Sequence, residues 1–539
     1  MSDKPPLRLE DIPVTNMTAY LLDKIRLYGD KVAMVDATTE KTTTYSELVT
    51  RIERATSGLQ AIGVMKDDAI GVLSPNHPDY LVTFYACALV GATLQPISPM
   101  YTKDDLAKGL RDCNTKFLFT VSALLPKVQE ATQGLEHIKV LLYGEAGGDY
   151  ETFESLLDPG HAPYRTPELD PRTSVAALMS SSGTTGFPKA VCISHYAIVA
   201  NTIQQMCAGL NSDKDTFVTF FPFFHALGLY MVCFVGHSLG ARIVIMPRFD
   251  FETFLRLIEK YKPTNLQLVP PIMVLLAKSP KVSEYDLSSV SQIACGAAPL
   301  SKEVEDLVKE KLKLPCIFQG YGMTEVGVTH LNGRGEFRYK SVGKLLPLTE
   351  MKIVDVETGK PVGPGQEGEI WIRGPQVCGG YLGLPEQTRE LFTNDGWVKT
   401  GDIGYEDEDG YLFVVDRLKE LIKYKAFQVA PATLEDILLR HDAIADVGVV
   451  GMPDVEAGEL PRAYVVRKQG REASEEEIRK FVDGPCHRFR RTMKPGGSPH
   501  EAAGRGGVLK EIPRTASGKI LRKSLRELAR ALAAKQAPA

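Results

Sequence analysis

Short apolar runs alternate with amphipathic helical patterns along most of this chain. The runs are rich in Val, Ile, Leu and Phe, a composition typical of buried strands. The pairs are strand 69–73 with helix 80–90, strand 117–121 with a helix around Leu125, and strand 266–269 with helix 272–278. Strands that alternate with helices in this way predict an α/β fold with largely parallel sheets.

The pattern changes near residue 351. From 351 to 415, short apolar runs are separated by turn signals such as Thr358-Gly359 and Gly363-Pro364-Gly365. This pattern is typical of antiparallel strands, so we predict a β-barrel-like subdomain at about 340–416. The large N-terminal domain would then comprise residues 1–417, and a small, mobile α+β domain would comprise residues 418–539.

The C-terminal part carries a βαβ-like pattern. Its expected elements are strands 446–450, 462–467 and 508–512 and helices 474–482 and 520–534. Residues 485–507 interrupt it with a stretch rich in Gly, Pro, Arg and His that has no apolar periodicity, so we expect a disordered loop there. A tolerated insertion and a reading-frame or splice error both explain this stretch.

Composition narrows the function class. The chain has 539 residues, a net charge of -4 and a pI near 6.3, which gives no electrostatic footprint for nucleic acid. The most apolar stretch, 230–246, is interrupted by His237, Gly240 and Arg242, so no membrane span is expected. The nine cysteines lack the paired spacings of a zinc site or a disulfide framework. No targeting segment is recognisable, so we predict a cytoplasmic enzyme that acts on a small molecule.

The stretch 180–189, Ser-Ser-Ser-Gly-Thr-Thr-Gly-Phe-Pro-Lys, has the residue types of a phosphate-binding loop. Glycines let backbone N–H groups surround an anion, hydroxyls donate to phosphate oxygens, and the lysine supplies a positive charge. The spacing is not that of a Walker A loop. A helical pattern begins only at His195 after the N-cap residue Ser194, so the loop is predicted to join two strands. A Ser/Gly-rich linker is the alternative explanation.

Further motifs follow in a fixed order. They are Gly296-Ala297-Ala298-Pro299-Leu300, Gln319-Gly320-Tyr321-Gly322-Met323-Thr324-Glu325, Thr400-Gly401-Asp402, the segment 416–429 (Asp-Arg-Leu-Lys-Glu-Leu-Ile-Lys-Tyr-Lys-Ala-Phe-Gln-Val) and the segment 513–522 (Pro-Arg-Thr-Ala-Ser-Gly-Lys-Ile-Leu-Arg). Together with the loop, they resemble the adenylate-forming superfamily, in its 4-coumarate:CoA ligase and firefly luciferase branch. The resemblance covers nearly the whole chain.

The resemblance implies a site for ATP and Mg²⁺. By this resemblance, the phosphates would be bound by Ser181, Ser182, Gly183, Thr184, Thr185, Gly186, Lys189 and Thr324. The nucleoside would be bound by Ala297, Gln319, Gly320, Tyr321, Asp402 and Arg417. Asp402 would accept both ribose hydroxyls, and Glu325 would bind magnesium. Lys519 would stabilise the charge that builds during adenylation. Alternatively, Glu325 is an acid in the first turn of a helix, Asp402 an exposed turn residue, and Lys519 a solvated lysine.

The resemblance also implies a coenzyme A site and an acyl pocket. The small domain would rotate at Lys419 and bring up Lys423, Lys425, Ala426 and Gln428, while Arg248 would meet the CoA phosphates or remain an ordinary surface arginine. His225 would gate an acyl pocket or sit in the core as a hydrogen-bonded histidine. The pocket would be lined by Phe224, Leu229, Gly296, Met323 and Val326. Ala426 replaces a glycine of the family, so its Cβ could crowd the thiol.

These observations predict an ATP-dependent, AMP-forming acid:CoA ligase. Its substrate would be an aromatic propenoic acid, like 4-coumarate, or a medium-chain carboxylic acid, activated as an acyl-adenylate. Two alternatives stay open: a luciferase-type monooxygenase, and a non-catalytic adenylate-binding protein, which the unusual 484–507 region would favour. The sequence does not indicate an oligomeric state.

Overall fold

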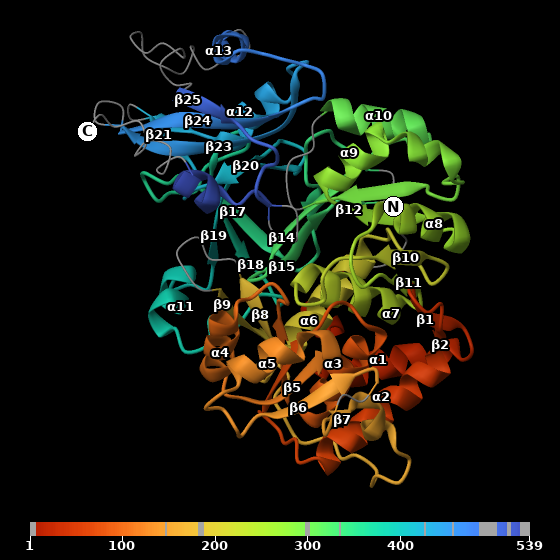
Figure 1. Ribbon diagram of the computed structural model, residues 1–539. Coiled ribbons are helices and arrows are strands. Elements are labelled where there is room, and N and C mark those ends of the chain that lie inside the picture. Colours follow the sequence, from red (N-terminus) through yellow and green to blue (C-terminus); the bar gives the residue numbers. More distant parts are fainter. Residues whose placement is uncertain are drawn as a thin grey trace.

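The computed structural model describes residues 7–145, 148–181, 188–296, 302–333, 336–424, 427–454, 458–483, 504–514 and 519–528. Figure 1 shows the red and orange N-terminal elements at one end and the blue C-terminal elements at the other, with the green sheets between them. The predicted mixed α/β class, with a large N-terminal and a small C-terminal part, is confirmed. In the described part of the chain, no helix is long and apolar enough to cross a membrane.

A seven-stranded sheet forms the N-terminal end. Its strands are parallel except for the last, which pairs antiparallel with its neighbour. In spatial order they are β7 (Glu151–Thr152), β6 (Lys139–Tyr143), β5 (Thr115–Val121), β3 (Ala69–Leu73), β4 (Thr93–Ile97), β8 (Val175–Ser181) and β9 (Lys189–Ser194). All five residues of β3 are buried, as expected of a central parallel strand covered on both faces.

The helices around this sheet follow the amphipathic patterns. They are α1 (Met17–Ile25), α2 (Tyr45–Ala61), α3 (Pro78–Val90), α4 (Lys103–Asp112), α5 (Leu125–Ala131) and α6 (His195–Cys207). Helix α3 begins with Pro78 in its first turn and is followed by Gly91, whose φ of 77° lets the chain turn back. Helix α6 is capped by Ser194, whose side chain accepts from the Ala197 N–H, as predicted.

Two further sheets follow in the N-terminal part. The first contains β10 (Thr216–Thr219), β11 (Arg242–Ile245), β1 (Val32–Asp36) and β2 (Thr42–Thr44). The second contains β12 (Asn265–Leu268), β13 (Gln292–Cys295), β14 (Phe318–Met323), β15 (Gly327–Leu331) and β16 (Lys344–Leu345). The helices beside them are α7 (Val235–Leu239), α8 (Phe251–Tyr261), α9 (Pro270–Lys278) and α10 (Lys302–Leu312).

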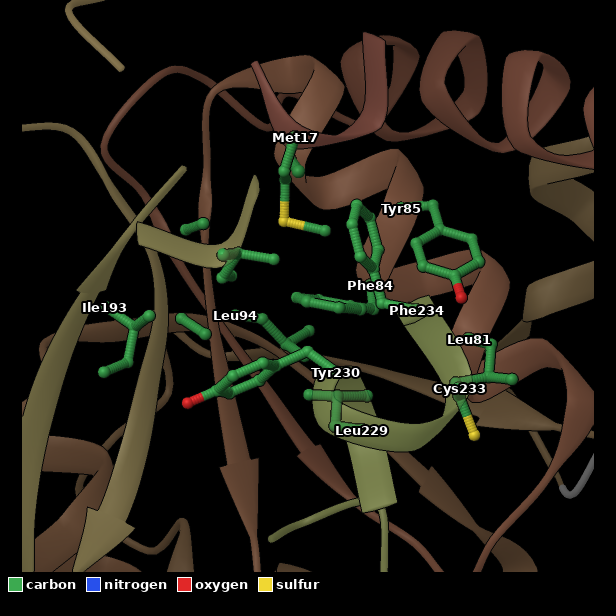
Figure 2. Close-up of a cluster of buried hydrophobic side chains, with 14 of the residues drawn as sticks. Met17, Leu81, Phe84, Tyr85, Leu94, Ile193, Leu229, Tyr230, Cys233 and Phe234 are labelled. Atoms are coloured by element: carbon green, nitrogen blue, oxygen red, sulfur yellow. The ribbon is translucent and has the colours of Figure 1, made fainter. Parts of the chain in front are cut away.

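The main core joins elements that are distant in the sequence. Figure 2 shows Met17 of α1, Phe84 and Tyr85 of α3 and Leu229 and Phe234 of a π-helix in one apolar cluster. The π-helix spans Leu227–Phe234, and all its residues after Leu227 are buried. Such helices are rare and occur frequently beside functional sites. The sequence indicated only an apolar segment here.

The change of pattern near residue 351 corresponds to an antiparallel sheet, as predicted. Its strands, in spatial order, are β17 (Glu350–Val354), β18 (Gly368–Arg373), β19 (Val398–Glu406) and β20 (Leu412–Arg417), and α11 (Pro385–Leu391) lies between β18 and β19 in the chain. Register shifts in β19 at Ile403/Gly404 bend the strand just after Asp402.

The C-terminal part has its own sheet and small core. Its elements are β21 (Ile422–Tyr424), β22 (Phe427–Val429), α12 (Pro431–Leu438), β23 (Ile444–Asp454), β24 (Gly458–Arg467), α13 (Glu475–Asp483), β25 (Gly504–Val508) and a helical segment at 522–528. Strands β23 and β24 form an antiparallel hairpin. The βαβ unit is therefore β24–α13–β25, in which β25 pairs parallel to β24.

Two expectations for this part were wrong. The expected strand 508–512 lies at 504–508 instead, which also places the end of the expected 485–507 loop in a strand. Only residues 504–507 of that loop are among those that the structure describes. Of the expected final helix 520–534 it describes residues 520–528, of which 522–528 are helical.

Candidate active site

The predicted phosphate loop lies between two antiparallel strands. Strand β8 ends at Ser181 and β9 begins at Lys189, and these two residues are paired in register. The loop therefore joins two strands, as predicted from the position of the next helix. Ser182, Gly183, Thr184, Thr185 and Gly186 lie outside the described residues. Lys189 is half-buried, and its Nζ lies 4.4 Å from the centroid of the Tyr381 ring.

A buried tyrosine and a buried aspartate from two further motifs form a hydrogen bond. The hydroxyl of Tyr321, in β14, donates to Asp402 Oδ2 at 2.6 Å, and Arg417 Nε lies 3.2 Å from Asp402 Oδ1. Burial and the neighbouring Asp402 carboxylate raise the pKa of Tyr321 well above its usual value, so the phenol stays protonated and donates. Asp402 is 5% exposed, so it is not the exposed turn residue of the alternative interpretation.

Two of the remaining predicted nucleoside residues lie on the same strand, β14. Gln319 and Gly320 precede Tyr321 in β14, and the Gln319 carbonyl accepts from Asn332 Nδ2 at 3.0 Å. A Cβ on Gly320 would lie 2.8 Å from Leu331 Cδ2 and 3.3 Å from the His330 carbonyl oxygen, so a larger residue would require the Leu331 side chain to shift. Ala297 lies outside the described residues.

Thr324 and Glu325 occupy the turn between β14 and β15. The alternative in which Glu325 begins a helix is therefore wrong. Glu325 is 4% exposed, and its Oε1 accepts a hydrogen bond from the Tyr381 hydroxyl at 3.0 Å. A buried carboxylate beside a phosphate loop fits a Mg²⁺ ion, which commonly uses one or two carboxylates together with phosphates and water.

Lys519 reaches this group from the C-terminal part of the chain. Burial lowers the pKa of Lys519, and the nearby Arg417 guanidinium lowers it further. The carboxylates of Asp402, Glu325 and Glu420 oppose this shift and favour the ammonium form. The half-buried Lys519 therefore lies within electrostatic range of Asp402, the predicted ribose ligand, and of Glu325, the predicted magnesium ligand. It is not a freely solvated lysine.

His225 precedes the π-helix and lies within electrostatic range of Lys519. Burial and the Lys519 charge lower the pKa of His225 to about 4, so the imidazole is neutral at physiological pH. Its Nδ1 accepts from the Leu227 N–H at 3.3 Å, which assigns the ring proton to Nε2. Nε2 is thus a donor that can face a carboxylate.

The predicted acyl-pocket residues differ in their surroundings. Phe224 and Met323 are half-buried, and a Cβ on Gly296 would meet no described atom within 4 Å. Leu229 and Val326 are both 0% exposed and belong to the main core, so neither side chain lines an open cavity here.

The residues expected to serve coenzyme A are exposed where the structure describes their side chains. Lys423, in β21, is exposed and paired with Gln428 of β22, and its N–H donates to Glu459 Oε2 at 2.8 Å. Lys419 and Arg248 are also exposed. Lys425 and Ala426 lie outside the described residues.

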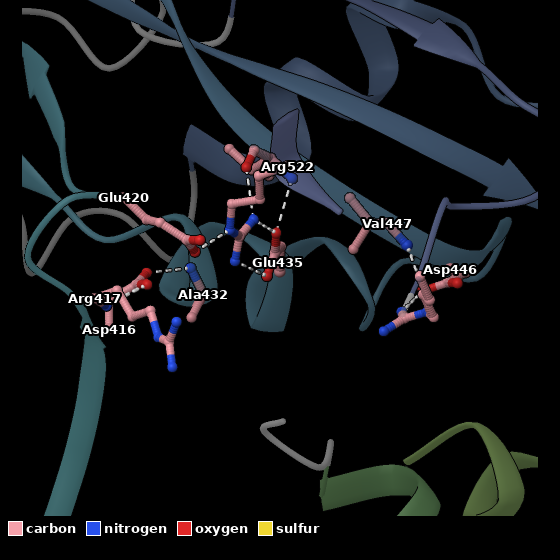
Figure 3. Close-up of polar contacts among 10 residues, drawn as sticks. Asp416, Arg417, Glu420, Ala432, Glu435, Asp446, Val447 and Arg522 are labelled. Atoms are coloured by element: carbon pink, nitrogen blue, oxygen red, sulfur yellow. Dashed lines mark hydrogen bonds and ion pairs between the residues drawn. The ribbon is translucent and has the colours of Figure 1, made fainter. Parts of the chain in front are cut away.

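A buried ion network holds the helix that follows Lys519. Figure 3 shows Arg522 between Glu420 and Glu435. Arg522 Nε donates to Glu420 Oε2 at 2.6 Å, Nη1 to the Val449 carbonyl at 2.7 Å, and the guanidinium forms a two-pronged pair with Glu435. The network joins the Lys519 segment to residue 420, next to the expected hinge. Sequence reasoning assigned no role to Arg522.

Another contact crosses the expected hinge. Asp416, at the end of β20, accepts from the Ala432 N–H of α12 at 2.9 Å and from the Arg417 N–H at 2.7 Å. Burial raises the pKa of Asp416 to about 6. This carboxylate therefore caps α12 from the N-terminal side of Lys419.

Tyr381 is the second residue that sequence reasoning missed. It contacts both Lys189 and Glu325, although it is separated from each by many residues. The available signal was the pair Gly379-Gly380 immediately before it, because paired glycines mark a close approach between backbones.

Solved structures share this fold over nearly the whole chain. ATP-bound MatB from Rhodopseudomonas palustris superposes with a TM-score of 0.86 at 25% identity, covering 96% of this chain and 100% of that one. o-Succinylbenzoate CoA synthetase from Bacillus subtilis, in complex with its acyl-adenylate intermediate, gives a TM-score of 0.78 at 25% identity, with coverage of 94% and 97%. The fold is that of adenylate-forming enzymes.

Sequence relatives agree. The AMP-binding enzyme model matches residues 22–382, and the AMP-binding enzyme C-terminal domain matches residues 433–519, so this chain belongs to the AMP-binding enzyme family. 4-coumarate–CoA ligase 2 of Petroselinum crispum is 39% identical over 518 residues, which cover 94% of this chain and 93% of the relative. Peroxisomal OPC-8:0-CoA ligase 1 of Arabidopsis thaliana is 36% identical over 539 residues, covering 98% and 96%.

Proposed function

We propose that this protein is an ATP-dependent, AMP-forming acid:CoA ligase. The observation that carries the proposal is the position of Lys519, whose charge interacts with Asp402, Glu325 and Arg417 across the two parts of the chain. Relatives named as CoA ligases over more than nine-tenths of the chain support the same reaction.

In the first half-reaction, a carboxylate oxygen of the acid attacks the α-phosphorus of ATP, the bond to the pyrophosphate oxygen breaks, and an acyl-adenylate forms. Positioning and charge stabilisation supply most of the catalysis in such phosphoryl chemistry. Lys519 would stabilise the charge on the α-phosphate and on the attacking carboxylate. His225 would donate from Nε2 toward that carboxylate, because its Nδ1 is already an acceptor. Thr324 would contact the α-phosphate.

The nucleotide would be held at three points. Ser181 and Lys189, with the loop between them, would take the β- and γ-phosphates. Asp402 would accept the ribose hydroxyls, because a carboxylate offers about four lone-pair sites and two are in use, by Tyr321 and Arg417. Glu325 would hold Mg²⁺, whose charge would neutralise the phosphate oxygens.

In the second half-reaction, the thiol sulfur of coenzyme A attacks the acyl carbon, AMP leaves, and the thiol proton is released. We propose that the small domain, beginning at residue 418, rotates at Lys419 before this step. The exposed Lys423 and its backbone partner Gln428 would then approach the adenylate, with Lys425 and Ala426, and Arg248 would meet the CoA phosphates. The contact between Asp416 and Ala432 spans this pivot, so rotation would break it.

For the acid, we propose an aromatic propenoic or medium-chain carboxylic acid. Relatives named for 4-coumarate and OPC-8:0 support an acid larger than acetate. Phe224, Met323 and Gly296 would line its pocket, and the packed side chains of Leu229 and Val326 would form the wall behind it. A cytoplasmic location stays a prediction from the sequence, to be tested by cell fractionation, since one relative is named as peroxisomal.

A panel of acids tests the proposal. Purified full-length protein is given ATP, Mg²⁺ and 4-coumarate, cinnamate, octanoate or acetate, and isotope exchange between ATP and pyrophosphate is followed. Acid-dependent exchange, with a thioester formed once CoA is added, is the expected result. Exchange without a thioester would favour an adenylating enzyme of another kind. Nucleotide binding without exchange for any acid would contradict the proposed function.

A further inference from the structure

Tyr381 contacts two charged side chains that come from different motifs. Its hydroxyl donates to Glu325 Oε1 at 3.0 Å, and the ammonium of Lys189 lies 4.4 Å from its ring centroid. A cation over an aromatic face is attracted by the ring quadrupole. Among the described residues, Lys189 and Glu325 form no direct ion pair with each other, so one tyrosine engages both.

The backbone around Tyr381 ties the same two motifs together. Residues 379–382 run beside β9: the Cys192 N–H donates to the Gly380 carbonyl at 2.9 Å, and the Leu382 N–H donates to the Ala190 carbonyl at 2.9 Å. One residue earlier, the Cys378 N–H donates to the Glu325 carbonyl at 2.9 Å. This short segment therefore links the strand that begins with Lys189 to the turn that carries Glu325.

The conformation of Tyr381 is fixed from the other side as well. Gly380 has a φ of 105°, and a Cβ there would lie 2.5 Å from Thr388 Cγ2, so only glycine fits. The Thr388 hydroxyl accepts from the Tyr381 N–H at 3.0 Å and donates to the Leu384 carbonyl at 2.9 Å. The backbone thus fixes the position of the Tyr381 Cα, from which the phenol extends, before any nucleotide binds.

We propose that Tyr381 is a positioning residue for the metal and the triphosphate. The inference rests on the proposed function. The phenol occupies Oε1 of Glu325 and thereby directs the other carboxylate oxygen toward the metal, while the ring holds Lys189 close by but separate. Without the phenol, the opposite charges of Lys189 and Glu325 would attract each other and close the space that Mg²⁺ and the phosphates must enter.

Two substitutions separate the two contacts. Tyr381→Phe keeps the ring under Lys189 and removes only the hydroxyl that reaches Glu325. Tyr381→Leu removes both. Tyr411 offers a matched control, because its ring lies under Arg338 at 4.6 Å and Lys344 at 4.8 Å in the antiparallel sheet region, with no contact to Lys189 or Glu325 in the described part of the chain.

Binding of α,β-methylene-ATP is measured by calorimetry at a series of Mg²⁺ concentrations and in EDTA. We expect Tyr381→Phe to raise the Mg²⁺ concentration for half-maximal binding by about tenfold or more, as loss of one hydrogen bond to a charged group does, with binding in EDTA unchanged. We expect Tyr381→Leu to weaken binding in EDTA as well, and Tyr411→Phe and Tyr411→Leu to leave both values at those of the wild type.

An unchanged Mg²⁺ requirement in Tyr381→Phe would overturn the proposal. Equal weakening with and without Mg²⁺ in this variant would also overturn it, because it would indicate a structural role. The phenylalanine variant decides the question even where the leucine variant does not fold. Failure of the proposed function is distinct, since it would appear as absence of acid-dependent exchange in the wild-type protein.

Discussion

Loss of the Arg522 guanidinium should destabilise the C-terminal part by several kcal/mol. Arg522 is 8% exposed and pairs with Glu435, itself 8% exposed, and with Glu420. Arg522→Met keeps the apolar stem but leaves the Glu435 carboxylate buried without a counter-ion. Breaking a buried ion pair on one side typically costs about 3–5 kcal/mol. Since whole domains are stable by about 5–15 kcal/mol, this change should open the C-terminal part locally.

Hydrogen exchange, measured peptide by peptide, resolves this effect by region. Tryptophan fluorescence would not report on it, because both tryptophans, Trp371 and Trp397, lie outside the C-terminal part. We expect faster exchange in α12 and β23 of Arg522→Met and unchanged exchange in β3 and α3. Arg514→Gln is the matched control. Its pair with Asp446 at 2.8 Å is 22% and 33% exposed at the side chains, so its loss should cost about 1 kcal/mol or less.

A second change tests the cause. Adding Glu435→Gln to Arg522→Met removes the uncompensated charge and keeps an acceptor for the Val449 N–H, which Glu435 Oε1 binds at 2.8 Å. The double variant should therefore recover part of the lost protection. Wild-type exchange in α12 of the single variant, or no recovery in the double variant, would refute the reasoning from a buried charge.

Three further outcomes follow from the structure. Burial raises the folded-state pKa of Asp416 from 3.8 to about 6, so the stability that protonated Asp416 contributes is present below about pH 4 and is lost as pH rises through about 6. In urea titrations the free energy of unfolding of the wild type, relative to that of Asp416→Asn, should fall by about 2–3 kcal/mol over this pH range. Parallel pH curves for the two proteins would refute this expectation. Tyr321→Phe removes a buried donor to Asp402, so the Kd for ATP should rise by about tenfold in calorimetry, whereas an unchanged Kd would exclude a role for that hydrogen bond. Gly380→Ala should lower Tm by several degrees in calorimetric scans, because Cβ would meet Thr388 at 2.5 Å and φ is 105°, and a wild-type Tm would contradict this steric argument.

The elements with strong periodicity could be predicted from the sequence. The bounds of β3 match the prediction at both ends, and α3 begins two residues before its predicted start. Buried parallel strands and capped helices carry their signal locally, which explains this agreement. Strand β25 was misplaced because Gly-Arg-Gly-Gly-Val has no apolar alternation, and only its pairing with β24 makes it a strand.

The site could be predicted less completely. Motif residues such as Asp402 and Lys519 were identified by resemblance, whereas Tyr381 and Arg522 were missed. Tyr381 reaches Glu325 across 56 positions of the chain, and Arg522 reaches Glu420 across 102 positions. Such contacts depend on the tertiary fold and leave no periodic signal. The hairpin turn at Glu325 was also not predicted. The alternative structure predicted there was the first turn of a helix, because an acid after a threonine is equally typical of a helix start.

The two half-reactions of Lys519→Ala test the central claim most directly. ATP–pyrophosphate exchange with a suitable acid reports adenylation, and thioester formation from supplied acyl-adenylate reports the second step. Lys523→Ala, which alters an exposed lysine one helical turn later, serves as the control. The account predicts a loss of about 10²-fold or more in exchange, as removal of one charge-stabilising group causes, with the second step preserved. An equal loss in both half-reactions, or wild-type exchange, would contradict it.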